Sequence, residues 1–306
     1  MNPSRRQFLK WAGLATGGLY AAKSVAGTQL AHGAKGSKKE DAEFYGLLID
    51  TTKCIGCRAC EEACNSHNKL PEPKESFSSE AVFEKVRDTS PGTFLVVNKH
   101  ANEKAPDSPV FSRKQCMHCD QPSCASACLC KAMVKTPEGP TVYHEDRCMG
   151  CRYCMISCPF DIPKFDYNDT APLVKKCIFC ADLVAKGQPS ACAEACPEGA
   201  TIFGKRRDLI EEAKKRIYQN PDKYYPHIYG EQEVGGTAFM YLSAVPFEKL
   251  GFRNDLGTKA YPELTSGFLG SVPLVDILWP AVLFGFNYLI TGKEEHKDSK
   301  EDGHGK

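Results

Sequence analysis

The chain of 306 residues is rich in cysteine, the residue whose thiolate binds soft metals. Sixteen of its seventeen cysteines fall into four groups of four. In chain order the groups are Cys54, Cys57, Cys60 and Cys64; Cys116, Cys119, Cys124 and Cys128; Cys148, Cys151, Cys154 and Cys158; and Cys177, Cys180, Cys192 and Cys196. Thiols repeated at such short intervals predict metal binding, and their spacing indicates which metal centre to expect.

The spacing within the groups favours iron-sulfur clusters of the [4Fe-4S] type. The first and third groups have the bacterial ferredoxin spacing C-x2-C-x2-C-x3-C, whereas the second and fourth groups widen the middle gap. Pro159 and Pro197 follow the last cysteines of the third and fourth groups. Three closely spaced thiolates can wrap around one face of a cubane, and the fourth ligates a different cluster. The groups therefore work in pairs, and spacing alone leaves three pairings open.

Disulfides and zinc are the two alternative uses of these cysteines. Disulfides are expected in an exported protein, but loops of two residues between successive cysteines are poor geometry for a disulfide framework. Zinc ribbons use two separated C-x2-C pairs and not the triple C-x2-C-x2-C. Four separate matches to the cluster spacing predict iron-sulfur binding.

Two residues beside the second group invite a ligand interpretation. Cys130 follows Cys128 after one residue, Leu129, where a proline would be usual. Because Cys128 keeps the three-residue spacing, we expect Cys130 to be a thiol that binds no iron, with an alternative ligand as the other possibility. His118 lies inside the group, and we expect it to be a neighbour of the cluster, since four thiolates are already available.

The N-terminus resembles a twin-arginine export signal over residues 1–26. The segment Ser4 to Lys10 reads SRRQFLK, a weakly apolar stretch follows, and Ser24-Val25-Ala26 offers a cleavage site. The alternative is a basic amphipathic helix. The resemblance implies export of a folded protein already loaded with its cofactor, and residues 27–42 are predicted to be a linker.

Composition limits the size of the core and the class of partner. The hydrophobic fraction of 42% includes the seventeen cysteines, so part of the scaffold must come from cross-links or metal. Without the first 26 residues the chain carries 35 basic and 38 acidic side chains. This near balance, with no long basic run, argues against a nucleic-acid partner.

Residues 267–291 are predicted to form a transmembrane helix. They contain one formal charge, Asp276, and are long enough to cross a bilayer core of about 30 Å. The alternative is a buried core helix. Lysines gather after the segment, at Lys293, Lys297 and Lys300. They predict a cytoplasmic tail, residues 292–306, and a main body on the periplasmic side.

Asp276 has two interpretations. A helix that begins near Ser271, with Pro273 in its first turn, would bring Asp276 close to the positive helix end and to the outer interface of the membrane that it spans. We favour this interpretation. In the other, Asp276 contacts a membrane partner or a quinone pocket.

Short β-type runs alternate with the cysteine groups and predict an α+β fold. The predicted strands are residues 44–49, 94–97, 133–134, 141–143 and 201–203. We expect a helix after the fourth cysteine of each group. A polar helix is predicted over residues 208–219, where charged side chains pair at helical spacing.

The four groups together resemble the four-cluster ferredoxin subunits of respiratory membrane oxidoreductases. The resemblance implies a four-cluster domain over residues 43–204, in which a second ferredoxin-like unit, residues 111–164, is inserted within the first, and a C-terminal extension over residues 205–266. It also implies four [4Fe-4S] clusters, whose ligands we call sets A to D. Set A is Cys54, Cys57, Cys60 and Cys196; set B is Cys64, Cys177, Cys180 and Cys192; set C is Cys116, Cys119, Cys124 and Cys158; set D is Cys128, Cys148, Cys151 and Cys154.

Within that family the strongest resemblance is to the iron-sulfur subunit of membrane-bound nickel-iron uptake hydrogenases. It is carried by the export signal and by the runs KQCMHC at 114–119, GCRYCM at 150–155, PKFDY at 163–167 and KYYPHIYG at 223–230. Leu129-Cys130 and a shorter stretch before Lys223 depart from the pattern. We expect the 225–227 and 235–236 segments to be a packed turn and a hairpin without chemistry.

The resemblance implies an electron-transfer subunit with no catalytic site of its own. Its partners would be the catalytic and small subunits of a hydrogenase, an integral membrane quinone or cytochrome subunit, and the bilayer. One alternative is the same relay in a molybdenum or tungsten enzyme, such as formate dehydrogenase or a sulfur-compound reductase. Another is a membrane-anchored adaptor stabilised by metal or disulfides. Cations beside the cysteines would favour reduced clusters if they are not ordinary solvated charges: Lys53, Arg58, Lys114, Arg147, Arg152, Lys175 and Lys176.

Overall fold

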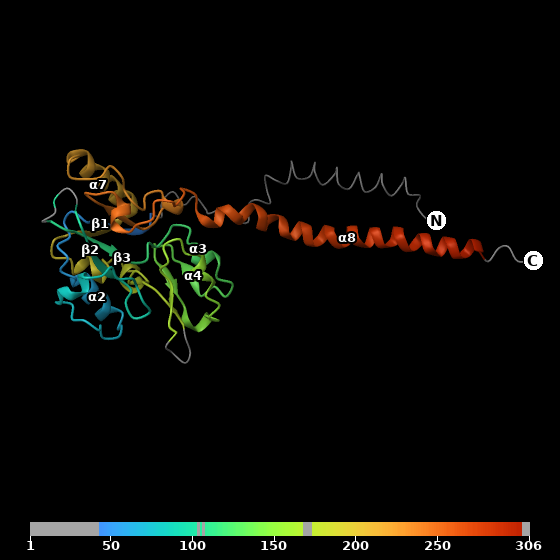
Figure 1. Cartoon of the computed structure of the whole chain (residues 1–306), viewed down its shortest axis with the longest axis horizontal. Coiled ribbons are helices and arrows are strands. Elements are labelled where there is room, and N and C mark those ends of the chain that lie inside the picture. The colour runs from blue at the N-terminus through green and yellow to red at the C-terminus, as the bar shows by residue number, and fades with distance from the viewer. Residues whose placement is uncertain (1–42, 103–104, 106–107, 168–172, 302–306) are drawn as a thin grey trace, which may run out of the picture. The chain divides into compact units, whose positions relative to one another are not determined.

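The computed structural model describes residues 43–102, 105, 108–167 and 173–301, so the predicted export signal and linker lie outside the described residues (Figure 1). The strands are β1 Tyr45–Asp50, β2 Val96–His100, β3 Val110–Lys114, β4 Met133–Lys135, β5 Thr141–Tyr143, β6 Lys164–Phe165, β7 Val174–Lys175, β8 Thr201–Lys205 and β9 Phe239–Leu242. The helices are α2 Ala59–His67, α3 Ser123–Ser126, α4 Tyr153–Ser157, α5 Ala181–Val184, α6 Ala191–Glu194, α7 Arg206–Gln219 and α8 Tyr261–Glu301, with 3-10 turns η2 Glu80–Phe83, η3 Glu145–Arg147, η4 Glu233–Gly235 and η5 Phe247–Leu250. This is an α+β arrangement, as predicted.

A three-stranded sheet in the order β8-β1-β9 organises the chain from both ends of its cysteine region. β1 pairs antiparallel with β8 and parallel with β9, so Leu48 lies opposite both Ile202 and Met240. Alternate residues of β1 face opposite sides, as the two-residue period of a strand requires. Leu47 and Ile49 enter one hydrophobic core, and Leu48 enters another.

The two faces of this sheet carry cores of different size. One face carries the largest core, which contains Phe179, Phe239 and Tyr241 together with Cys60 and Cys64. On the other face α7 packs with Leu209 and Ala213. This helix is the polar helix predicted for residues 208–219, and it begins two residues earlier.

Residues 115–176, between β3 and α5, form what we call the inserted segment. Its strands form two small hairpins, β4 with β5 and β6 with β7. The helices α3 and α4 lie side by side in the green part of Figure 1 and contact each other. The strands predicted at 133–134 and 141–143 are confirmed, whereas the strand predicted at 94–97 begins at Val96 and pairs with β3.

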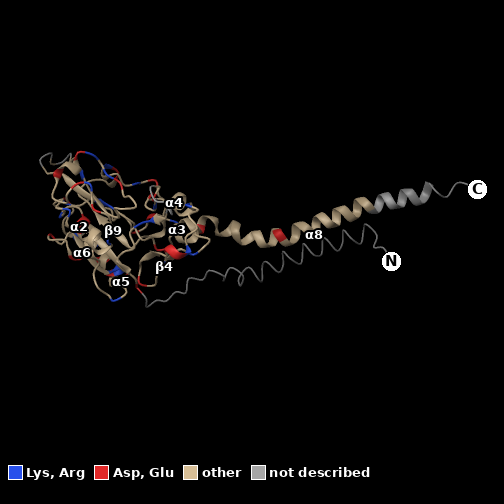
Figure 2. Ribbon diagram, turned by 90° about the horizontal axis from the view of Figure 1, so that it is seen from below, with Lys and Arg blue, Asp and Glu red and all other residues tan. Residues whose placement is uncertain are grey.

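The C-terminal helix α8 differs from the prediction in where it begins. Its first residue is Tyr261, and Pro273 and Pro280 lie inside it. Residues Tyr261–Thr291 are long and apolar enough to cross a membrane, and Figure 2 shows few charged residues along them. The interpretation that Pro273 lies in the first turn, with Asp276 close to the positive helix end, is therefore wrong. Fifteen residues from Tyr261, Asp276 is beyond the turn where the helix dipole favours an acid.

Candidate metal centres

The backbone turns in the same way inside each cysteine group. The second residue after the first cysteine has a positive φ in all four groups: Gly56 74°, His118 49°, Gly150 71° and Phe179 60°. This left-handed turn directs backbone N–H groups at the preceding sulfur. The N–H of Gly150 lies 3.4 Å from Cys148 Sγ, and that of Phe179 lies 3.4 Å from Cys177 Sγ. In these two groups the backbone loop of the C-x2-C spacing thus lets a cysteine sulfur accept a hydrogen bond from an amide N–H.

The prediction of a helix after each fourth cysteine is wrong. In the second, third and fourth groups the helix ends before the fourth cysteine, at Ser126, Ser157 and Glu194. In the first group α2 contains both the third and the fourth cysteines. An interval of four residues is about one helical turn, so a single turn carries the chain from the third thiol to the fourth. Pro159 and Pro197 disfavour helical backbone at the cysteine before them.

The thiols of sets A and D line two separate cavities. One cavity is lined by Cys54, Cys57, Cys60 and Cys196, and the other by Cys128, Cys148, Cys151 and Cys154. In each cavity three of these thiols come from one group and one comes from another group, and Cys130 also lines the set D cavity. The structure thus brings together the first group with the fourth, and the second group with the third.

Within set B, and within set C, the thiols also lie close to one another. Burial raises the pKa of Cys64, and the thiols of Cys192 and Cys180 raise it further. The pKa of Cys177 is also raised, first by burial and then by Cys64 and other thiols. In set C burial raises the pKa of Cys119, and the thiols of its three set partners follow as causes: Cys116, Cys158 and Cys124.

The donor set fits an iron-sulfur cluster. All seventeen cysteines are free thiols. Burial raises the pKa of Cys60 and Cys124 to about 12 and that of Cys154 and Cys180 to about 11. Buried thiols that crowd one another in this way become thiolates only when a metal supplies positive charge. Within the described ranges, no three His, Cys, Asp or Glu side chains are gathered closely enough for a single metal ion.

The two residues beside the second group lie in different surroundings. Cys130 lines the set D cavity next to Cys128. His118 is buried, its Nδ1 lies 2.9 Å from the backbone N of Thr141, and its ring packs between Phe179 and Phe239. Burial, and then two nearby lysines, hold the pKa of His118 well below its usual value.

Two lysines, the buried Lys176 and the half-buried Lys135, hold the loops around set C. Lys135 Nζ donates to the carbonyls of His118, Cys119 and Gly139, at 3.1, 2.9 and 2.7 Å. Lys176 Nζ donates to the carbonyl of Cys177 at 3.0 Å and also to Thr141. Lys176 was identified from the sequence by its place beside Cys177. Lys135 lies seven residues from the nearest set member and offered no such signal.

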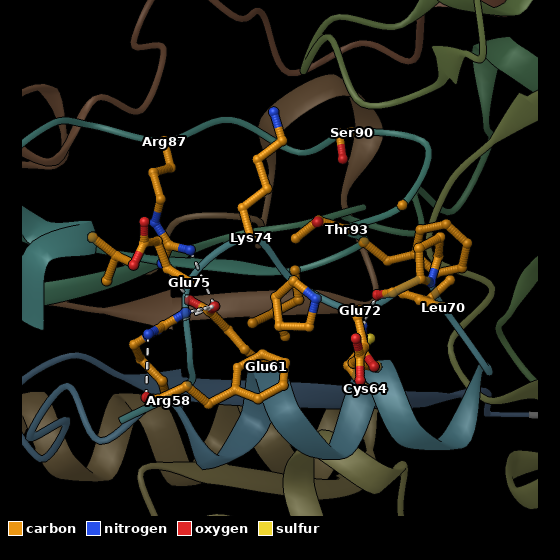
Figure 3. Close-up of a pocket in the computed structure, with 18 residues that line it drawn as sticks. Arg58, Glu61, Cys64, Leu70, Glu72, Lys74, Glu75, Arg87, Ser90 and Thr93 are labelled. Carbon is orange, nitrogen blue, oxygen red and sulfur yellow. Dashed lines mark hydrogen bonds and ion pairs between the residues drawn. The ribbon is translucent and has the colours of Figure 1, made fainter. Parts of the chain in front are cut away.

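The helix α2, which carries two cysteines of the first group, is fixed by a buried carboxylate. Glu61 accepts from Arg58 at 3.0 Å and from Arg87 at 2.5 Å (Figure 3). It also accepts from the Val97 backbone at 2.6 Å, and Arg58 donates to the carbonyls of Ser76, Phe77 and Ser79. These contacts border a cavity of about 340 Å³ and fasten the segment between the first two groups onto α2. Arg58 is thus a buried, paired arginine and not a solvated charge.

The 225–227 segment is hydrogen-bonded to neighbouring parts of the chain, and the 235–236 segment lies between Tyr229 and Tyr241, which form an antiparallel bridge. Tyr225 donates its N–H to Ser243, and His227 Nε2 lies 2.6 Å from Glu233 Oε1. Gly235 and Gly236 have φ of 84° and 93°. A Cβ on Gly235 would lie 2.8 Å from the Cβ of Ala260, so both the conformation and the space favour glycine.

Comparisons with known proteins agree with this site. Family models described as a 4Fe-4S dicluster domain match residues 108–206 and residues 53–132. A protein of Nitratidesulfovibrio vulgaris is 48% identical over 97% of this chain and 79% of its own length. Hydrogenase-2 operon protein HybA of Escherichia coli O157:H7 is 34% identical over 98% of this chain and 99% of its own. The iron-sulfur subunit of the nitrate-inducible formate dehydrogenase of Escherichia coli K12 is 31% identical over 84% of this chain and 88% of its own.

The site and these matches define an iron-sulfur protein of the dicluster ferredoxin class. More narrowly, the chain belongs to the ferredoxin-type iron-sulfur subunits of respiratory oxidoreductases. It binds [4Fe-4S] clusters, and its function is electron transfer.

Proposed function

We propose that the chain relays single electrons through four [4Fe-4S] clusters, held by sets A, B, C and D. The observation that carries this proposal is the exchange of one cysteine between paired groups. Two cavities each combine three thiols of one group with one thiol of another, as the dicluster arrangement requires. The ligand sets, the nested arrangement and the inserted unit 111–164 within the domain 43–204 are parts of the same proposal.

The neighbouring thiols support a relay in the order A, B, C, D. Sets A and B meet along α2, where the Cys60 thiol is among the causes that raise the pKa of Cys64, after burial. Sets B and C are linked because Cys116 acts in the same way on Cys177, again after burial. Sets C and D approach each other in the inserted segment, where Cys154 acts on Cys124, again after burial.

A bound [4Fe-4S] cluster supplies a one-electron couple, whose potential lies between about −700 and +450 mV. The chain's own groups tune that couple and limit its contact with water. Amide N–H groups of Gly150 and Phe179 donate to ligand sulfurs, and Ala132 N lies 3.2 Å from Cys128 Sγ. Such hydrogen bonds stabilise charge on the sulfur and raise the potential.

A hydrogenase is the catalytic partner that the comparisons favour. The match to HybA extends over nearly the whole of both chains, whereas the formate dehydrogenase match covers 84% of this one. A molybdenum or tungsten enzyme remains the second candidate, on the strength of that match. The chain would accept electrons from a periplasmic catalytic subunit and deliver them to a quinone-reactive membrane subunit. It would have no catalytic site of its own.

The proposed location is the periplasmic side of the cytoplasmic membrane. Support comes from the twin-arginine sequence of residues 1–26, from the apolar length of α8 and from the lysines that follow residue 291. Affinity purification of the full chain from membranes, followed by mass spectrometry of the co-purifying subunits, tests the partner. Recovery of a nickel-iron catalytic subunit supports hydrogenase, and recovery of a molybdenum subunit supports the alternative.

The cluster assignment is tested by comparing single cysteine variants of anaerobically purified protein. We expect Cys57→Ser and Cys196→Ser to remove the same electron paramagnetic resonance signal, although these residues belong to different groups. Cys180→Ser should remove a different one, although it is closer to Cys196 in the sequence. Cys130→Ser is the matched control and should keep all signals and about sixteen irons per chain. Loss of one shared signal in Cys180→Ser and Cys196→Ser would refute the pairing, and zinc or no metal in the unaltered chain would refute the relay.

A further inference from the structure

Arg113 is a buried arginine at the point where sets A and B meet. It lies on β3 opposite Val97, and only 3% of its surface is exposed. Its Nη1 donates to Thr201 Oγ1 at 2.8 Å, and its Nη2 lies 4.0 Å from the sulfur of Cys192. Arg113 also lines the cavity that contains the four thiols of set A.

The titratable groups around Arg113 include thiols of both sets. Burial acts to lower the pKa of Arg113, and Cys192 of set B, Cys60 of set A, Tyr241 and then Cys54 of set A act to raise it. Arg113 in turn acts against the rise that burial causes in the pKa of Cys54 and Cys60 of set A and of Cys64 of set B. Among the described residues, Arg113 forms no ion pair with a carboxylate.

This setting differs from that of the other arginines near the first group. Arg58 is also buried, but the carboxylate of Glu61 neutralises it at 3.0 Å. A buried charge without a partner costs several kcal/mol, so a buried guanidinium must be balanced by a nearby anion. Because arginine stays protonated in proteins, its positive charge is permanent. The thiolates of two ligand sets are the anions available to Arg113.

We propose that Arg113 is a positioning residue that raises the reduction potentials of the two clusters held by sets A and B. Reduction adds a negative charge to each cluster, and a fixed cation in a poorly solvated interior stabilises that added charge. Sets C and D lie in the inserted segment, so their clusters receive less of this stabilisation. The inference rests on the proposed assignment of ligands to sets A and B.

The experiment is a potentiometric titration, followed by electron paramagnetic resonance, of the full chain carrying Arg113→Gln. We expect two of the four reduction steps to move to lower potential and the other two to stay in place. If the substitution makes the reduction of a cluster about tenfold less favourable, the reduction potential of that one-electron step falls by about 59 mV. Arg113→Lys keeps a positive charge at the site and should restore at least part of the shift.

Arg206→Gln is the matched control. Arg206 is also largely buried, but it donates to the carbonyls of Thr237 and Glu231, and its charged neighbours are carboxylates. We expect this variant to leave all four potentials unchanged. Iron analysis accompanies each titration, because a variant that loses iron has lost a cluster, which tests the relay and not the tuning.

Two results would overturn the inference. One is a fully loaded Arg113→Gln protein whose potentials equal those of the unaltered chain. The other is an equal shift of all four steps, which would indicate a general change in the fold. If Arg113→Gln does not bind its clusters, the Arg113→Lys protein tests the inference instead. A shift of all four reduction steps in Arg113→Lys, or the loss of all four clusters, would assign Arg113 a purely structural role.

Discussion

The two halves of the cluster-binding region have hydrophobic cores of very different size. Sets A and B adjoin the three-stranded sheet and a core of twenty buried residues, among them Leu47, Phe239 and Tyr241. Sets C and D lie in the inserted segment, whose own core has four buried residues: Cys124, Met133, Cys154 and Val174. Two of these four residues, Cys124 and Cys154, belong to the proposed ligand sets. We therefore expect apolar burial to stabilise the first half and bound metal to stabilise the second.

Removal of iron is the strongest way to test this contrast. A chelator under anaerobic conditions should unfold the inserted segment, because metal-ligand bonds supply most of its folding free energy. The sheet β8-β1-β9 should keep much of its protection, because its core is largely apolar. Hydrogen exchange read by mass spectrometry would report complete loss of protection in β4 and β5. Equal loss in β1 would show that the two halves are not different in this way.

Phe239→Ala tests the core of the first half. The ring of Phe239 is 1% exposed and contacts Phe179 and His118. Truncating a buried phenylalanine costs about 3–5 kcal/mol, from lost apolar burial and the cavity left behind. The measurement is anaerobic urea unfolding of the loaded protein. A loss below about 1 kcal/mol would mean that clusters, and not the apolar core, stabilise this half too.

Glu61→Gln tests the polar clamp on α2 and should have an intermediate effect. The substitution removes a buried charge that pairs with Arg58 and Arg87. We expect a loss of about 1–3 kcal/mol in the free energy of unfolding, since buried donors keep only a neutral acceptor. Glu62→Gln, on the exposed side of the same helix, is the control and should be close to neutral.

Asp88→Asn tests the ionic contact between the two halves and should have the smallest effect. Asp88 bridges Lys114 of β3, at 2.9 Å, and Lys164 of β6, at 3.3 Å. Its carboxyl is 46% exposed, so we expect a loss of only about 0.2–1 kcal/mol in urea unfolding at neutral pH. Reduced sensitivity to added salt in the variant would support the contact, and unchanged sensitivity would argue against it.

The pH dependence of that contact has a definite sign. Burial acts to raise the pKa of Asp88, but its hydrogen bond to Lys114 and the two lysine charges outweigh burial and lower it. A carboxyl whose pKa is depressed in the folded state contributes stability above its unfolded pKa, about 3.9. The contribution disappears as pH falls through the lower, folded value. Asp88→Asn should therefore make the free energy of unfolding less dependent on pH, and only below about pH 4.

The sequence predicted which class of cofactor the chain binds, but it did not predict which residues surround each thiol. Cysteine spacing carries local geometry, and the strands at 133–135 and 141–143 follow from short apolar runs beside a turn. The position of the short helices was misjudged because the four-residue interval from the third cysteine to the fourth is itself about one helical turn. Spacing contains no signal for Arg113, whose neighbours Cys60 and Cys192 are far away in the sequence.

Two other features depend on distant partners. The strand β9 had no prediction, because its pairing with β1 joins Leu48 to Met240 across most of the chain. The start of α8 was misplaced because Pro273 was taken for a proline of the first turn, where proline is favoured. Pro262 occupies that position instead, and the helix continues through Pro273.

The position of β1 between β8 and β9 also has a consequence for synthesis of the chain. β1 is made early, but its hydrogen-bonding partners Thr201–Lys205 and Phe239–Leu242 emerge last among the strands. At about 5–20 residues per second, β1 waits roughly 10–40 s on the ribosome before its second neighbour appears. Until β8 emerges this apolar strand has two open edges, and until β9 emerges it keeps one, so it can pair with other chains. A ribosome that stops before residue 242 releases a chain that cannot complete its central sheet.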